Sequence, residues 1–337
     1  MIDYSEIKRL SLLSGLKVQT KENFYQVNQT YPIKLSEHIK NTILESKSHA
    51  IATQFLPQVE EVESEIGIGA FFPEEKHKTE RLVQKYPNRC MIYTTGNCFA
   101  NCRHCSRKEK WKENNAFSIN LFDESYLEIL RTDYYEEVLL TGGDALTNNN
   151  NQIAYMLEKL SSIKHIKTIR LATRAFTSNP KRITSELCAV LEKYNKTIIV
   201  TQFNSKDEFT KDTVNAIRQI QHTGIPILNQ SVLLKGVNDE YILLKELLST
   251  CAEYRVIPYY LFHCFNVRGV QHLRTTIEKG IELTNKLVGN VGGWWIPRYI
   301  LIPDSTGIKV PMCPNGFVDK SDGFLIKDFR GETHKYI

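Results

Sequence analysis

The sequence lacks any long uninterrupted apolar run. No stretch of its 337 residues reaches the roughly 18 apolar residues from which a membrane-spanning helix is made. The first six residues, MIDYSE, do not supply the apolar core of a secretory signal peptide. We therefore expect a cytoplasmic protein with no membrane partner.

An excess of charge of one sign is also missing. The 43 Lys and Arg residues nearly balance the 38 Asp and Glu residues, and the net charge of +5 is small for this length. No basic run with interleaved aromatic residues suggests nucleic-acid binding. Low-complexity segments and clean internal repeats are absent as well. With 42% hydrophobic residues, the composition indicates a globular protein that does not bind nucleic acid.

Cysteine, by contrast, is present in eight copies, and three of them fall within residues 98–105. In a secreted protein an even count would suggest disulfides, but crowding without an export signal is typical of a metal site in a reducing compartment. The other five lie in apolar segments and are expected to be buried structural residues. They are Cys90, Cys188, Cys251, Cys264 and Cys313.

From about residue 90 onward, short β-branched or aromatic runs alternate with helical patterns. The predicted strands are residues 91–95, 137–141, 168–173, 197–203, 227–234 and 257–264. The helical patterns between and after them are 125–131, 153–163, 185–194, 212–222, 242–254 and 275–288. Such alternation predicts βαβ units and a parallel sheet. Six units predict an α/β fold, a partial (β/α)6 TIM-like barrel, with chemistry at the carboxyl ends of its strands.

The chain divides into three predicted parts. Residues 1–80 form an N-terminal helical segment, with an amphipathic helix at 34–47 and an acidic connection at 56–69. Residues 81–290 form the barrel. Residues 291–337 form a C-terminal extension, whose strand-like segment 294–302 is expected to close the barrel.

The motif CFANCRHC places Cys98, Cys102 and Cys105 in one loop directly after the first predicted strand. Three thiolates can bind three irons of a [4Fe–4S] cluster, which leaves the fourth iron free to chelate a small molecule. Zinc is the alternative, but a structural zinc takes four ligands. His104 lies between two of the thiols with poor reach as a fourth ligand, so the spacing favours the cluster.

This spacing at the mouth of a partial barrel resembles the radical S-adenosylmethionine (SAM) enzymes. After the second predicted strand the chain reads Thr141-Gly142-Gly143-Asp144, and in that superfamily a Gly-Gly-acid turn binds the amino group of SAM. Glycines allow a close backbone approach. The resemblance assigns Gly142, Gly143, Asp144 and His104 to cofactor binding.

Several further motifs, in order and spacing, resemble the lysine 2,3-aminomutase family across residues 75–337. They are YPNR at 86–89, CRHCSR at 102–107, GGDAL at 142–146, NQSVLL at 229–234, GVND at 236–239 and PYY at 258–260. The segments 170–174 and 182–184 also look like that family. The resemblance implies pyridoxal 5′-phosphate (PLP) as a second cofactor. It implies an isomerase that moves the α-amino group of an L-α-amino acid to the β-carbon, after a 5′-deoxyadenosyl radical removes a hydrogen.

The same resemblance assigns the residues around PLP. Lys309, in PDSTGIKVPM at 303–312, takes the place of the Schiff-base lysine, although the loop keeps only one glycine of the family's run. Arg89 matches a position near the PLP phosphate, a dianion that a bidentate guanidinium suits. Asn229 and Gln230, at the end of a strand, are assigned to either cofactor. Arg107 falls where the family has the arginine that pairs with the substrate α-carboxylate.

Two residues depart from the lysine-specific pattern. Where that pattern has aspartates that hold the substrate ammonium, this chain has Phe265 and Ile302. An ammonium buried there without a partner would be strongly destabilised, although Asp304 could substitute if the loop shifts. We rank neutral or aromatic substrates first, acidic ones served by Arg268 or Asn266 second, and lysine or arginine third.

Two other functions stay open at this point. One is a radical enzyme of the same fold that acts on another substrate, such as a lysine of a protein. The other is a non-catalytic iron–sulfur or zinc protein. The family also implies a one-electron donor such as flavodoxin or ferredoxin. Because no cysteine follows Cys313, the family's structural zinc site between subunits is expected to be absent, and a homo-oligomer is left open.

Overall fold

The computed structural model describes residues 3–67, 76–113, 115–305, 307–312, 317–319, 324–328 and 330–336. Its N-terminal helices are α1 (Tyr4–Ser14), α2 (Lys21–Thr30), α3 (Glu37–Ser46), α4 (His49–Phe55) and α5 (Glu60–Glu63). The side chains of Thr20, Ser36 and Ser48 cap α2, α3 and α4 by accepting a backbone N–H from the first turn. The apolar faces of these helices share a core that also takes in Ala100 and Cys102. The N-terminal segment therefore packs directly on the cysteine loop.

Ten strands form one sheet in chain order. They are β1 (Lys76–His77), β2 (Leu82–Tyr86), β3 (Arg89–Thr95), β4 (Glu137–Gly142), β5 (Thr168–Ala172), β6 (Thr197–Thr201), β7 (Ile227–Leu233), β8 (Ile257–His263), β9 (Arg298–Leu301) and β10 (Val310–Pro311). Every pair from β3 to β9 is parallel, whereas β1, β2 and β10 add antiparallel edges. The two edge strands are not paired with each other among the described residues, so the predicted partial barrel is confirmed.

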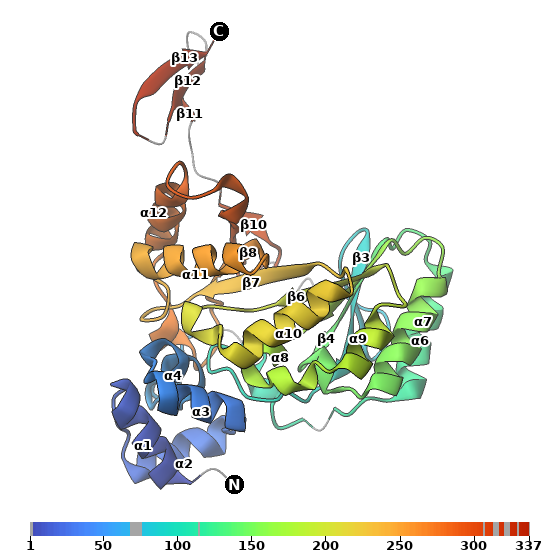
Figure 1. Ribbon diagram of the computed structural model, residues 1–337, viewed down its shortest axis with the longest axis horizontal. Helices are drawn as coiled ribbons and strands as arrows, with labels where there is room; N and C mark the ends of the chain where they lie inside the picture. Colours follow the sequence, from blue (N-terminus) through green and yellow to red (C-terminus); the bar gives the residue numbers. More distant parts are fainter. Residues whose placement is uncertain are drawn as a thin grey trace.

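Helices cover the outer face of this sheet (Figure 1). They are α6 (Ile119–Arg131), α7 (Asn150–Ser162), α8 (Ala175–Ser178), α9 (Ser185–Leu191), α10 (Lys211–His222), α11 (Tyr241–Glu253) and α12 (Ile277–Leu287). Short 3-10 turns join them: η1 (Lys108–Lys110), η2 (Ala145–Thr147), η3 (Pro180–Arg182), η4 (Lys206–Glu208), η5 (Gln271–Leu273) and η6 (Gly293–Trp295). Alternate strand residues such as Ile169 and Leu171 point outward into this layer, and Arg170 between them points inward.

Three differences from the sequence prediction concern the edges. The β1–β2 hairpin was not predicted, whereas β9 lies within the predicted segment 294–302 and β10 adds an unpredicted antiparallel strand beside it. The C-terminal strands β11 (Phe317–Asp319), β12 (Phe324–Lys327) and β13 (Thr333–Tyr336) form a separate sheet beyond α12 (Figure 1).

No helix within the described ranges is both long and apolar enough to cross a membrane. Cys90, Cys188, Cys251 and Cys264 are buried as expected, and Cys313 lies outside the described residues.

Candidate active site

Two adjoining cavities lie inside the partial barrel, one at the carboxyl ends of the parallel strands and one that reaches back to Arg89 and Met91 of β3. The first, called the cysteine cavity, has a volume of about 250 Å³ and is lined by Cys98, Cys102 and Cys105. The second, called the lysine cavity, has a volume of about 210 Å³ and contains Lys309. The residues that line both are Ser106, Arg107, Thr141, Gln230, Phe262 and Phe265. The three cysteines and the lysine therefore face spaces that share one wall.

Backbone contacts from the N-terminal segment hold the cysteine loop. The N–H of Asn101 donates to the carbonyl of Lys34 (2.8 Å), and the N–H of Arg103 donates to the carbonyl of Gln54 (2.8 Å). Within the loop, the N–H of Cys105 donates to the carbonyl of Cys102 (2.9 Å). This turn brings the three thiols to one cavity, as the sequence spacing predicts.

A buried ion cluster lies beneath the loop. Glu61 accepts hydrogen bonds from Arg103 (Nε, 2.9 Å) and Lys108 (Nζ, 2.7 Å), and all three side chains are at most 1% exposed. Burial alone would raise the pKa of Glu61, but the two cations lower it to about 2. Lys108 also donates to the carbonyl of Gly269 (2.6 Å). Glu61, which belongs to the acidic connection predicted at 56–69, therefore joins α5 to the cysteine loop.

The Gly-Gly-Asp turn packs against the backbone that precedes the first cysteine. A Cβ atom on Gly142, whose φ is +130°, would lie 2.1 Å from the carbonyl oxygen of Thr95. A Cβ atom on Gly143 would lie 2.0 Å from the carbonyl oxygen of Asn97. The N–H groups of Gly143 and Asp144 donate to those same two carbonyls (2.6 and 2.7 Å). Both glycines are thus required by close backbone approach.

Asp144 lines the cysteine cavity, and its side chain is held by hydrogen bonds from the protein. It accepts hydrogen bonds from the Thr173 hydroxyl (2.7 Å), the Arg174 N–H (2.7 Å) and the Leu146 N–H (2.9 Å). Burial raises its pKa, and these hydrogen bonds oppose the rise. These contacts do not test the pairing of this carboxylate with an ammonium, which stays a prediction. They show that Asp144 joins the turn to the segment after β5.

Three buried polar atoms that line the cysteine cavity have no hydrogen-bond partner in the described part of the chain. They are Nδ1 of His104, Nη1 of Arg174 and Oγ1 of Thr201. The Gln202 amide donates to Nε2 of His104 (2.9 Å), and burial lowers the pKa of His104 well below its usual value. Unsatisfied buried polar groups are rare and costly in folded proteins. Their gathering at one cavity indicates that a polar ligand belongs there.

Burial affects the acidity of two of the three cysteine thiols. Burial raises the pKa of Cys98 well above its usual range and also raises that of Cys102, although Arg174 opposes the second shift. A buried thiol therefore stays protonated until a metal replaces the proton. The N–H of Arg107 donates to the sulfur of Cys105 (3.3 Å). These contacts fit a cluster ligated by three thiolates.

Lys309 occupies the lysine cavity at the start of β10. Its backbone N–H donates to the Tyr86 hydroxyl (2.9 Å). Its ammonium lies 5.1 Å from the ring centre of Tyr86 and 5.8 and 5.9 Å from those of Tyr260 and Phe262. Burial, followed by the charges of Arg170 and Arg89, lowers its pKa to about 8. A lysine with a lowered pKa is suited to form a Schiff base.

The lysine cavity gathers four further cationic side chains: Lys85, Arg89, Arg107 and Arg170. Arg89 stacks over the ring of Tyr86 at 4.0 Å, and Arg107 stacks over that of Tyr93 at 3.7 Å. Arg170 pairs with Glu137 (2.7 Å), but its buried Nε has no partner among the described residues. Such a cluster of positive charge in a partly closed space fits anionic groups.

The remaining predicted residues divide into two groups. Gln230, Phe265 and Ile302 line the lysine cavity as expected, whereas Asn229 and Asp304 line neither cavity. The Asn229 amide is buried, donates to the carbonyl of Phe203 (3.1 Å) and accepts its N–H (2.7 Å). The Asn229 side chain therefore joins β7 to the segment after β6 and is not exposed to either cavity.

The polar residues suggested for an acidic substrate are engaged elsewhere. Asp304 accepts a hydrogen bond from Asn266, whose carbonyl in turn accepts one from Arg274 (2.7 Å). Arg268 forms an ion pair with Glu109 (2.7 Å). Neither Asn266 nor Arg268 lines the lysine cavity.

Sequence reasoning missed Arg170, Arg174 and Gln202 as site residues. Two of them lie in the segment 170–174, which already looked family-like. The strand pattern could have identified Arg170, because this charged residue interrupts a β-branched strand at a position that must face the barrel interior.

Comparisons with known proteins agree with this geometry. Residues 92–247 match the model of the Radical SAM superfamily. The chain is 34% identical to an L-lysine 2,3-aminomutase of Methanococcus maripaludis (76% of this chain, 60% of that protein). It is 34% identical to a glutamate 2,3-aminomutase of Clostridioides difficile (75% and 61%). It is 33% identical to a putative L-lysine 2,3-aminomutase of Aquifex aeolicus over 98% of this chain and 91% of that protein. The chain thus spans about 60% of the length of the first two relatives.

Proposed function

The chain belongs to the lysine 2,3-aminomutase family of radical SAM enzymes, and from this we propose that it is a 2,3-aminomutase for an L-α-amino acid with an uncharged side chain. The observation that carries the proposal is the pair of adjoining cavities, one with three cysteines and one with Lys309, which share Arg107, Gln230 and Phe265 in their walls. A radical formed in the first cavity would therefore lie next to a substrate bound in the second.

The residues present fit both cofactors. In the cysteine cavity, Cys98, Cys102 and Cys105 would hold the [4Fe–4S] cluster, and the unpartnered atoms of His104 and Thr201 are available to SAM. In the lysine cavity, Lys309 would form the Schiff base and Arg89, with Lys85 beside it, would bind the phosphate. When bound, the cluster and SAM supply a carbon radical that removes hydrogen, and PLP supplies a conjugated system that spreads the unpaired electron.

The protein's own part is to bind, orient and exclude water. Arg107 is held over Tyr93 and donates to the carbonyl of Gly142 (3.4 Å), which directs its guanidinium toward the wall between the cavities. A substrate α-carboxylate bound to Arg107 would lie at the wall that the two cavities share. Phe262 and Phe265, stacked at 5.7 Å, supply an apolar part of the same wall. Holding reactants in one geometry, away from water, is the main catalytic contribution here.

The distribution of charge selects the class of substrate. Arg89 and Lys85 are matched by the phosphate and Arg107 by the α-carboxylate, while Arg170 already pairs with Glu137. Under this assignment the cations that line the cavity are engaged, except that Nε of Arg170 has no partner among the described residues. A side-chain ammonium would add a further positive charge to this cluster.

The side chains at the substrate end of the cavity agree with that assignment. Phe265 and Ile302 both line it and belong to the same apolar cluster. Apolar groups gain free energy when they contact apolar groups and lose it when they desolvate a charge. We therefore rank an aliphatic or aromatic amino acid above glutamate, and glutamate above lysine.

The test is a competition among substrates. The protein is reconstituted anaerobically with iron, sulfide, PLP and SAM, reduced with dithionite, and incubated with pooled leucine, phenylalanine, glutamate and lysine. The expected product is a β-isomer of a neutral amino acid, detected by mass spectrometry, and none should form with Cys98→Ala. A dominant β-lysine would refute the substrate class, and absence of any β-isomer from a pool of all amino acids would refute the aminomutase.

A further inference from the structure

We infer that Arg174 is a positioning residue for the iron–sulfur cluster: its remaining N–H is directed at the sulfur of Cys102 and raises the cluster's reduction potential. The inference rests on the proposed function, because it requires the cluster to be present. Arg174 is 8% exposed and lines the cysteine cavity together with Cys102. The resemblance to the family assigned no role to this residue.

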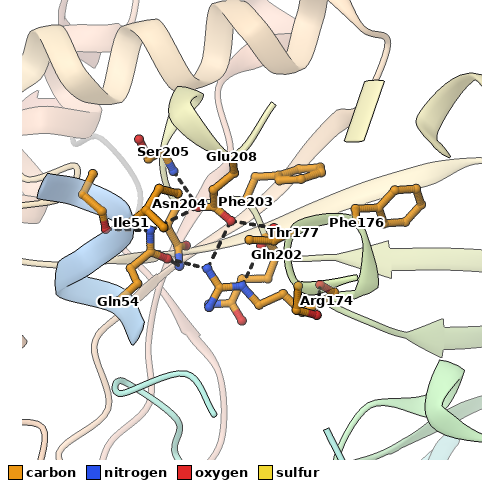
Figure 2. A network of polar contacts seen from close by, with 12 residues as sticks. Ile51, Gln54, Arg174, Phe176, Thr177, Gln202, Phe203, Asn204, Ser205 and Glu208 are labelled. Atoms are coloured by element: carbon orange, nitrogen blue, oxygen red, sulfur yellow. Dashed lines mark hydrogen bonds and ion pairs between the residues drawn. The ribbon is translucent and has the colours of Figure 1, made fainter. Parts of the chain in front are cut away.

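The guanidinium of Arg174 is fixed by contacts on three sides (Figure 2). Its Nε donates to the carbonyl of Gln202 (3.2 Å), and its Nη2 donates to the Gln54 amide oxygen and to Glu208 (3.1 Å). The ring of Phe55 lies 4.6 Å from its central carbon. Of its three nitrogens only Nη1 is left over.

That nitrogen belongs to a side chain that lines the cysteine cavity together with Cys102. Nη1 is buried and has no hydrogen-bond partner in the described part of the chain. Arg174 acts on the Cys102 thiol, because its positive charge opposes the rise in pKa that burial causes there. A thiolate bound to iron would be a better acceptor than a protonated thiol, because it carries negative charge.

Glu208 keeps the cation in place without approaching the cavity itself. Its Oε1 accepts the N–H groups of Asn204 (2.7 Å) and Ser205 (3.0 Å), and its Oε2 accepts the Thr177 hydroxyl (2.6 Å) as well as Arg174. Glu208 does not line the cysteine cavity. The ion pair is therefore oriented, with the positive end toward the cysteines and the negative end held by backbone donors.

The sign of the effect follows from this orientation. One-electron reduction changes a [4Fe–4S] cluster from the 2+ to the 1+ state, with the electron taken from a low-potential donor, and so adds negative charge. Hydrogen bonds to cluster sulfurs and nearby positive charge stabilise the reduced state and raise the potential. Arg174 would thus ease the entry of the electron that starts the reaction.

The test is a redox titration of the reconstituted protein without SAM, followed by electron paramagnetic resonance. Arg174→Gln should make reduction at least tenfold less favourable, a shift of about 60 mV to more negative potential for one electron. Glu208→Gln should shift the potential in the opposite direction, because it removes the balancing negative charge. Arg174→Lys keeps the positive charge but not the planar guanidinium, so its reduction potential should lie between those of the wild type and Arg174→Gln.

Two controls separate this effect from damage to the fold. The double variant Arg174→Gln/Glu208→Gln leaves no buried charge without a partner. Its cluster should still have a more negative reduction potential than that of the wild type, because the guanidinium N–H is gone. Arg182→Gln removes a cation that donates to the carbonyls of Leu146 (2.7 Å) and Asn148 (2.9 Å) and does not line the cysteine cavity. It should leave the potential unchanged.

The outcomes distinguish this inference from the proposed function. If the wild-type protein binds no cluster, the proposed function itself fails. If all variants bind four irons but Arg174→Gln has the wild-type potential, the inference fails alone. A shift that appears only after SAM is added would also overturn it, because the guanidinium would then serve SAM rather than the cluster.

Discussion

Replacing Lys309 by methionine should stabilise the cofactor-free protein at neutral pH, even though Lys309 is proposed to carry the chemistry. Burial and the nearby cations lower the pKa of Lys309 from 10.5 to about 8. Each pKa unit corresponds to about 1.36 kcal/mol, so keeping this ammonium in the cavity destabilises the folded state by up to about 3 kcal/mol. Screening by solvent at the open side of the cavity reduces this to about 2 kcal/mol.

The pH dependence follows from the direction of the shift. The unfolded chain keeps the Lys309 proton up to its ordinary pKa of 10.5, whereas the folded protein releases it near pH 8. Between these values the unfolded state binds more protons, so the stability of the wild-type protein rises with pH across this window. Below the window the destabilisation is complete, and above it the destabilisation is gone. Lys309→Met lacks this slope.

The assay is urea unfolding of the cofactor-free protein at pH 7 and again near pH 10, followed by tryptophan fluorescence and circular dichroism. Lys309→Met should be the more stable protein at pH 7, and the difference should shrink toward zero at the higher pH. Lys235→Met, at an exposed position, is the matched control and should show no such change. If Lys309→Met were destabilising at pH 7, or if its effect did not depend on pH, Lys309 would not be a buried cation.

Three further results are expected. Phe265→Asp/Ile302→Asp should increase the ratio of β-lysine to neutral β-amino acids in the substrate competition, because it introduces two carboxylates to pair with an ammonium. Gly143→Ala should greatly reduce the iron bound on reconstitution, because its Cβ would lie 2.0 Å from the Asn97 carbonyl oxygen. Glu61→Gln should lower the free energy of unfolding by about 3–5 kcal/mol at pH 7, because it leaves two buried cations unpaired. Since its pKa is lowered from 4.5 to about 2, the wild-type advantage is fully present above pH 4.5 and is lost as the pH falls through 2.

The barrel could be predicted from the sequence because its signals are local. Each parallel strand is a short β-branched run, and each helix carries its own period, as in α10, where Thr213, Ala216, Ile217 and Ile220 form the buried face. Lys309 and the residues of the cysteine loop could be assigned because their motifs are contiguous in the chain. The β1–β2 hairpin was missed, because its strands are short and its first strand is wholly exposed.

The contacts of individual polar side chains could not be predicted, because they depend on distant segments. Asp144 and Asn229 occupy positions in which a motif suggests a cofactor ligand, and Asp144 forms hydrogen bonds with the segment after β5, Asn229 with the segment after β6. Nothing near them in the sequence distinguishes a carboxylate that faces a cavity from one that caps a neighbouring strand. The hydrogen bond from Arg174 to Gln54 joins residues that are 120 positions apart in the sequence, and no periodicity or motif predicts it.

Two buried ion clusters explain why the N-terminal helices belong to the active site, although their sequence shows no chemistry. Glu61 of α5 neutralises Arg103 and Lys108 on one side of the cysteine loop, and Gln54 of α4 bonds to Arg174 on the other. Because cations left unpaired in the interior are strongly destabilising, Glu61 helps to hold the loop in this conformation. Residues 3–67 therefore contribute to the geometry of the three thiols alongside the barrel.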